Sequence, residues 1–141
     1  MISALAKASA AFGDDEYARA ARRAADFALT CLRDEHGRLF KRYRLGRASQ
    51  AGVLDDYAYL VCGLIDLYEA TFEERYLEAA LQLNATMRHH FWDTKEGGLF
   101  LSADDAETLI VRPKEGYDGA LPSGNSVAAA NFVRLGRLTG R

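Results

Sequence analysis

The sequence has little of several features that mark specialised classes of protein. Its 141 residues include two cysteines and two prolines, and no apolar run approaches the ~20 residues that a membrane-spanning helix needs. Neither sign of charge dominates, because 18 basic and 20 acidic side chains leave a net charge of −2. Without a basic surplus there is no field to hold nucleic acid or an anionic membrane, so we expect neither as a partner.

The two cysteines, Cys31 and Cys62, have no CxxC spacing. This pattern argues against a zinc site or a redox pair, and it favours small apolar side chains packed in helices in a reducing compartment. The opening MISALAKASAAFG contains an Ala-Ser-Ala that resembles a signal cleavage site, but it lacks a basic start and Lys7 interrupts its apolar stretch. We therefore expect a helix there and a cytoplasmic protein.

The composition, 49% hydrophobic and 27% charged, is that of an ordinary globular protein, and the length suits a single domain over residues 1–141. Apolar residues recur every three or four positions in two amphipathic stretches, 14–33 and 73–91. Residues 57–68 are apolar almost all round, with only Asp66 charged, which is typical of a helix surrounded by protein. We predict five helices, at 2–12, 14–33, 54–70, 73–91 and 124–138.

The two halves of the chain resemble each other with a period of ~60 residues. GDDEYARAA followed by LRDEHGRLF matches FEERYLEAA followed by FWDTKEGGLF, which pairs Tyr17 with Tyr76 and Asp34 with Asp93. A third copy begins in FVRLGRLTGR. Two helices and a loop per repeat predict stacked hairpins, each of which needs neighbours to bury its apolar face. The predicted fold class is all-α, a partial (α/α)6 toroid of about two and a half helical hairpins.

The connections between the predicted helices alternate between short and long. Inner helices lead into outer helices through two residues, whereas the return connections are long, at about 34–53 and 92–122. All long loops should therefore emerge on one face, carrying small β-hairpins built from the β-like stretches 38–43, 98–102 and 108–111. The N-termini of the inner helices lie on the same face, and their unpaired N–H groups favour acceptors and anions. Any binding site is expected there.

Three strings of the chain carry a resemblance to a known family: the opening ISALAKA, LDDYAYLVCGLIDLYEAT at 54–71 and LIVRPKEGYDGALPSGNSVAA at 109–129. They resemble the helical domain of thioredoxin-domain-containing proteins of the spermatogenesis-associated type, over essentially the whole chain. The resemblance implies a six-hairpin toroid similar to N-acylglucosamine epimerases and six-hairpin glycosidases, with no settled activity. The thioredoxin-like part and its cysteine motif are absent here, so no redox role is implied.

Polar residues gather where two inner helices are predicted to begin. Asp55 and Asp56 point ~100° apart on a helix, so one would cap the backbone while the other faces a pocket; the alternative is that both cap. As neighbours they cannot form the opposed carboxylate pair of a glycosidase, and Asp118 or a further hairpin would supply the partner. We take these three as catalytic candidates. The ligand-binding candidates are Tyr57, Arg112, Lys114, Tyr117, Ser123 and Asn125, although Ser123 is also an ordinary N-cap.

The leading hypothesis is a toroid fragment that binds a small polar ligand, a carbohydrate by preference, at the inner-helix N-termini. We expect no metal and no cofactor. The alternative is a non-catalytic helical repeat scaffold that binds protein or supports a missing thioredoxin-like domain. About two and a half hairpins leave apolar flanks on the terminal inner helices, so we also expect the chain to self-associate through these open ends.

Overall fold

Five helices and one β-hairpin make up the computed structural model, which describes residues 1–107 and 110–140. The elements are α1 (Ile2–Phe12), α2 (Asp15–Cys31), β1 (Phe40–Arg44), β2 (Arg47–Ala51), α3 (Leu54–Thr71), α4 (Glu74–Phe91) and α5 (Gly124–Thr139). Every helix lies within two residues of its predicted range, so the helix predictions are confirmed. Among the described helices, none has the length and apolar composition needed to cross a membrane.

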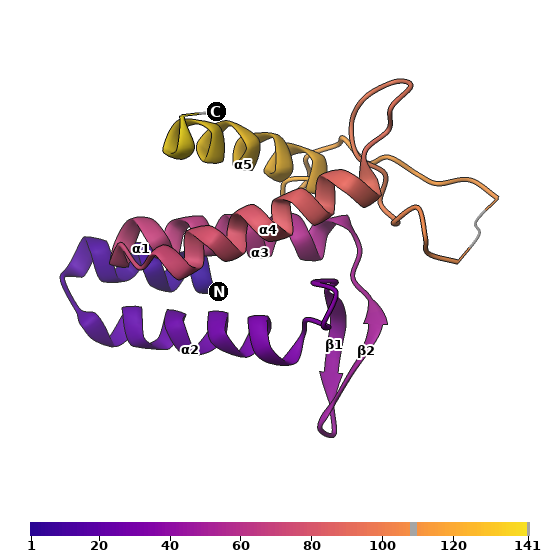
Figure 1. The fold of residues 1–141 in the computed structure, drawn as a ribbon. Coiled ribbons are helices and arrows are strands. Elements are labelled where there is room, and N and C mark those ends of the chain that lie inside the picture. Colours follow the sequence, from indigo (N-terminus) through magenta and orange to yellow (C-terminus); the bar gives the residue numbers. More distant parts are fainter. Residues whose placement is uncertain (108–109, 141) are drawn as a thin grey trace.

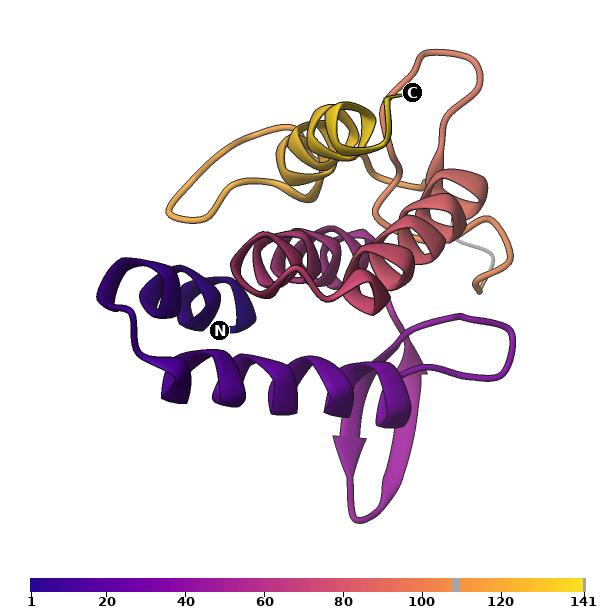
Figure 2. The same cartoon turned by 60° about the vertical axis from the view of Figure 1, so that its left-hand side comes forward.

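Helix α3 lies at the centre of the molecule. It packs against α1, α4 and α5, while α2 packs mainly on α1 (Figures 1 and 2). Its fully buried residues include Tyr57, Val61, Leu64, Ile65 and Leu67. The apolar pattern of 57–68 therefore correctly indicated a helix enclosed by protein, with α1 and α5 as its inner neighbours and α2 and α4 as outer helices.

The inner helices all end in the same way. The residues after them, Gly13, Phe72 and Gly140, adopt the left-handed conformation, with φ of 66°, 55° and 70°, and each donates its N–H to a carbonyl of the last turn. Glycine takes this conformation without strain, whereas Phe72 takes it with a side chain that is 77% exposed. The first two of these caps turn the chain directly into α2 and α4.

Both long connections emerge at one end of the bundle, as predicted (Figure 1). The first forms the antiparallel hairpin β1–β2, in which Arg44 pairs with Arg47. The expected strand at 98–102 does not form, because its N–H groups bond to three separate places: Asn125, Phe91 and Pro113. Of the stretch 108–111, residues 108 and 109 lie outside the described residues.

The repeat seen in the sequence is also visible in the hydrogen bonds. Phe40 N–H donates to Leu32 at the end of α2, and Phe100 N–H donates to Phe91 at the end of α4, both at 2.8 Å. The aspartates that follow, Asp34 and Asp93, each accept two backbone N–H groups of their own turn. Both halves therefore fold the end of the outer helix by the same local bonds.

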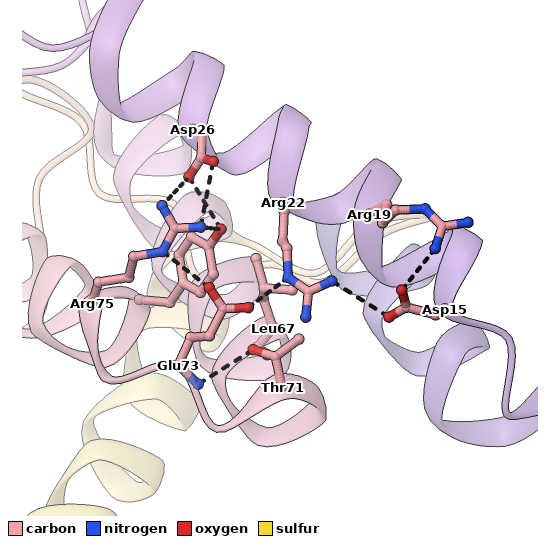
Figure 3. A network of polar contacts seen from close by, with 9 residues as sticks. Asp15, Arg19, Arg22, Asp26, Leu67, Thr71, Glu73 and Arg75 are labelled. Carbon is pink, nitrogen blue, oxygen red and sulfur yellow. Dashed lines mark hydrogen bonds and ion pairs between the residues drawn. The ribbon is translucent and has the colours of Figure 1, made fainter.

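Polar contacts hold the outer helices side by side (Figure 3). Arg22 on α2 pairs with Glu73, the N-cap residue of α4, and Arg75 on α4 bonds to both carboxylate oxygens of Asp26. Further along, Arg33 donates to Gln82 at 3.0 Å. Half-exposed pairs contribute little stability individually, so these contacts mainly fix how α2 and α4 are aligned.

A charged cluster joins the three inner helices at equivalent positions. Asp66 on α3 has a side chain that is only 3% exposed; it pairs with Arg134 on α5 and Lys7 on α1, and it accepts a hydrogen bond from Ser3. Arg134 also pairs with Glu69. A buried carboxylate needs partners of this kind, because an unpaired charge in the interior is costly.

Candidate functional site

The candidate site lies where α3 and α5 begin, on the end of the bundle that carries the long loops. Ser123 is the N-cap of α5, and its hydroxyl accepts a hydrogen bond from the N–H of Ser126 at 3.2 Å. Asp118 accepts the N–H of Ser123 at 2.8 Å. These backbone and hydroxyl donors lower the pKa of Asp118, so its carboxylate is ionised at neutral pH. The capping role considered for Ser123 is the one observed.

The structure divides the roles of the two adjacent aspartates on α3. Asp56 accepts the N–H of Val53 at 2.8 Å and completes the cap of the helix. Asp55 points instead toward α5, where one carboxylate oxygen would lie 2.3 Å from a Cβ added at Gly124. Among the described residues, the Asp55 carboxylate has no hydrogen-bond partner. Position 124 must be Gly to leave room for the Asp55 carboxylate in this position.

Tyr59 is a site residue that the sequence analysis missed. Its hydroxyl donates to the carbonyl of Pro122 at 2.6 Å, and its side chain is 39% exposed. Burial, and then the charges of Asp55 and Asp118, raise the pKa of Tyr59. The segment that Tyr59 bonds at Pro122 continues into Ser123, which Asp118 holds, and into Gly124, which Asp55 faces. We call Asp55, Tyr59 and Asp118 the helix-end cluster. The available signal was the spacing of Asp55 and Tyr59, which are four residues apart and share one side of a helix.

Tyr57 and Asn125 each join the start of an inner helix to the long loop that precedes it. The hydroxyl of Tyr57 accepts the N–H of Leu39 at 2.8 Å, and the side-chain oxygen of Asn125 accepts the N–H of Leu99 at the same distance. Asn125 also donates to the carbonyls of Leu99 and Glu115. Tyr57 is fully buried. The structure therefore shows both side chains holding the backbone of a loop against the start of a helix.

The two loop cations lie away from the helix-end cluster. Arg112 stacks on the ring of Phe100, 4.2 Å from its centre, and donates to the carbonyls of Ser102 and His90. Lys114 pairs with Asp93 at 2.7 Å, and this contact lowers the pKa of Asp93 to about 2. Both cations thus fasten the loop after α4.

Tyr117, the remaining ligand-binding candidate, is 87% exposed. Among the expected candidates, Asp118 bonds to Ser123 and Asp55 reaches the neighbouring Gly124, while Tyr59 bonds to Pro122 just before them.

A second polar group lies beside the end of α4, outside the site residues expected from the sequence. His90, Asp104 and Asp105 offer possible metal-ligand atoms within 4.8 Å of one another. His90 Nδ1 lies 2.8 Å from Asp104, while Arg38 donates to both oxygens of Asp105. This Arg38 pairing lowers the pKa of Asp105. A cation would have to displace Arg38 to use that carboxylate, and the group is better explained as an ion pair that anchors the loop.

Comparison with known proteins finds relatives along nearly the whole chain. Spermatogenesis-associated protein 20 of Homo sapiens is 39% identical over 150 residues, which cover 99% of this chain and 19% of that protein. The Mus musculus protein of the same name gives the same figures. An uncharacterized protein of Caenorhabditis elegans is 32% identical over 142 residues, covering 95% of this chain and 19% of the relative.

No protein-family model matches the chain. The chain spans about a fifth of the length of the curated relatives it matches. Over that span, it is a homologue of part of spermatogenesis-associated protein 20.

Proposed function

We propose that the helix-end cluster binds a small polyhydroxylated ligand of the carbohydrate type. The observation that carries the proposal is the carboxylate of Asp55, which has no hydrogen-bond partner among the described residues and faces Gly124, next to the Ser123 that Asp118 holds. Carboxylates accept hydrogen bonds from hydroxyl groups, and a half-exposed aromatic ring gives the apolar face of a sugar a surface to contact.

The proposed setting is an (α/α)6 toroid, of which this chain supplies about two and a half hairpins. Three features support this arrangement: α1 and α5 pack beside the central α3, α2 and α4 lie outside them, and the long loops emerge at one end. In a catalytic form of the proposal, Asp118 remains ionised and Asp55 acts as the general acid or base toward the ligand.

The test is a titration of this chain, uniformly labelled with ¹⁵N, with a panel of neutral and acidic monosaccharides, followed by amide chemical shifts. The proposal expects shifts at Asp55, Tyr59 and the first turn of α5. Asp55→Asn should abolish them. Asp56→Asn is the matched control, because Asn keeps the capping acceptor while removing the same charge from the adjacent residue. Equal effects of the two substitutions, or shifts confined to another surface, would contradict the proposal.

A non-catalytic scaffold is the second candidate function. Its support is that Tyr57, Asn125, Ser123, Arg112 and Lys114 are all engaged in internal bonds. In addition, an apolar groove lies open between α4 and α5. Unchanged amide spectra across the sugar panel, together with binding in that groove, would favour the scaffold.

A further inference from the structure

A groove runs between α4 and α5, on the side of the molecule away from α2. Its volume is about 1120 Å³. Leu81, Ala85 and Trp92 line it from α4 and its C-cap, and Phe132 and Leu135 line it from α5. The side chain of Trp92 is 44% exposed. Figures 1 and 2 show α5 and α4 on the two sides of this space.

The internal repeat identifies the α4 wall of the groove. On α2, Arg22 and Asp26 contact the next outer helix and its N-cap (Figure 3). Arg33, just beyond the end of α2, contacts it as well. Tyr17 matches Tyr76, 59 residues later, and the same spacing carries those three positions to Leu81, Ala85 and Trp92. The surface of α4 that lines the groove is therefore the equivalent of the surface of α2 whose polar side chains bond to α4 and its N-cap.

The α5 wall is equivalent to the surface of α3 that α4 covers. The alignment of FVRLGRLTGR with LIDLYEATFE pairs Phe132 with Leu64 and Leu135 with Leu67. Leu64 and Leu67 are fully buried in a helix that packs closely on α4, whereas at the groove Phe132 is only half-buried and Leu135 is buried. Both walls thus correspond to surfaces that are covered by a helix one repeat earlier.

The charge on the groove differs from that of the α2–α4 contact. Its charged lining is Arg88 and the titratable His89, both exposed on α4, and no carboxylate belongs to the lining residues that the structure describes. In the α2–α4 contact, by contrast, both signs are present, from Arg22, Asp26 and Glu73. A basic rim beside an apolar floor favours an occupant with acidic side chains along one edge.

We propose that the groove binds an amphipathic α-helix with an apolar stripe and an acidic edge, packed on α5 and α4 as α4 packs on α3 and α2. Helix-in-groove recognition of this kind uses apolar anchors at three- and four-residue spacing. The proposal is independent of the sugar site, because the groove shares no residue with the helix-end cluster.

The probe is a synthetic peptide of residues 74–91, which is the sequence of the helix that occupies the equivalent place one repeat earlier. Arg75 and Gln82 face α2 in the structure, so the peptide carries Arg75→Glu and Gln82→Glu to give it the acidic edge. Trp92 is the single tryptophan of the protein and the peptide has none. Docking should therefore shift the tryptophan emission to shorter wavelength and saturate with added peptide. A second peptide with Leu83→Ser and Met87→Ser, which breaks the apolar stripe, should give no shift.

Matched substitutions at Ala85 test the location and the charge. This side chain is exposed, and both Glu and Lys are good helix formers, so Ala85→Glu and Ala85→Lys should both fold. We expect Ala85→Glu to weaken peptide binding by about tenfold or more, because like charges then meet across the groove, and Ala85→Lys to retain it.

Three results would overturn the proposal. They are no saturable change in Trp92 emission, equal affinities of the two Ala85 variants for the acidic peptide, and an emission shift that depends on protein concentration without peptide. The last result would show that a second copy of the chain covers the groove.

Discussion

Replacing Tyr57 by Phe removes one oxygen atom from the interior and leaves the packing in place. The ring of Tyr57 stays against Phe91, whose centre is 5.2 Å away, so no cavity forms. What is lost is the acceptor for the N–H of Leu39, a residue that is only 4% exposed. Arg38 loses a weaker contact, at 3.3 Å, and keeps its bonds to Asp105.

The size of the effect follows from the backbone N–H of Leu39, which loses its acceptor. Leaving a buried N–H without an acceptor costs about 1–3 kcal/mol, whereas losing a hydrogen bond that water can replace costs less. Since the N–H of Leu39 cannot reach solvent, Tyr57→Phe should lower the free energy of unfolding by about 1–3 kcal/mol. That is a substantial share of the 5–15 kcal/mol typical of a domain.

Urea unfolding followed by circular dichroism measures this difference, with the slope m expected to stay unchanged because the same surface is exposed. Tyr117→Phe is the matched control: Tyr117 is 87% exposed, and its substitution should change stability by less than about 0.5 kcal/mol. If Tyr57→Phe were as stable as the control, the hydroxyl would not hold the first repeat loop, and a role in ligand contact would have to be reconsidered.

Three further predictions follow from the loop, the α3–α5 contact and α4. The pKa of Asp93 is about 2 against an ordinary 3.8, so its stabilising pair with Lys114 is intact above about pH 4 and lost as the pH falls toward 2. Lys114→Met should therefore flatten the dependence of the urea midpoint on pH between about pH 4 and 2. An unchanged pH profile would refute this pairing. Gly124→Ala should destabilise by about 1–3 kcal/mol in urea unfolding, because its Cβ would meet Asp55; a neutral result would mean that Asp55 moves freely. Burial and Asp26 raise the pKa of Tyr76 to about 12, so ultraviolet titration should find one tyrosine that ionises near pH 12. Tyr76→Phe should remove that step. A titration curve left unchanged by this substitution would contradict the contact between Tyr76 and Asp26.

Local pattern was sufficient for the helices, because each signal lies within a few turns of the chain. The apolar spacing relates residues three and four positions apart, and the five helices were predicted from it to within two residues. The match between the two halves likewise needs only the sequence. It correctly indicated the shared turns that follow α2 and α4.

The candidate site depended on contacts that no local pattern contains. From the sequence, Tyr57 and Asn125 were ligand-binding candidates near a helix start. Their bonds to the N–H groups of Leu39 and Leu99 could not be foreseen, because those groups belong to loops 18 and 26 residues away. Arg112 and Lys114 were likewise grouped with Asp118 by their place in the sequence, yet they bond to the end of α4 and the first part of the loop that follows it.

The sequence by itself determined which segments are helical, which helices are enclosed by protein and where the repeats begin, because these properties depend on spacing along the chain. Tertiary structure alone decided which polar groups remain available. Asp56 caps its helix, Asp118 supports Ser123, and Asp55 is left turned toward α5. The same is true of the groove beside Trp92, which exists only because α4 and α5 stand apart. The physical reason is that each donor and acceptor bonds with whatever the fold brings within about 3 Å, and that distance is set by packing between distant segments.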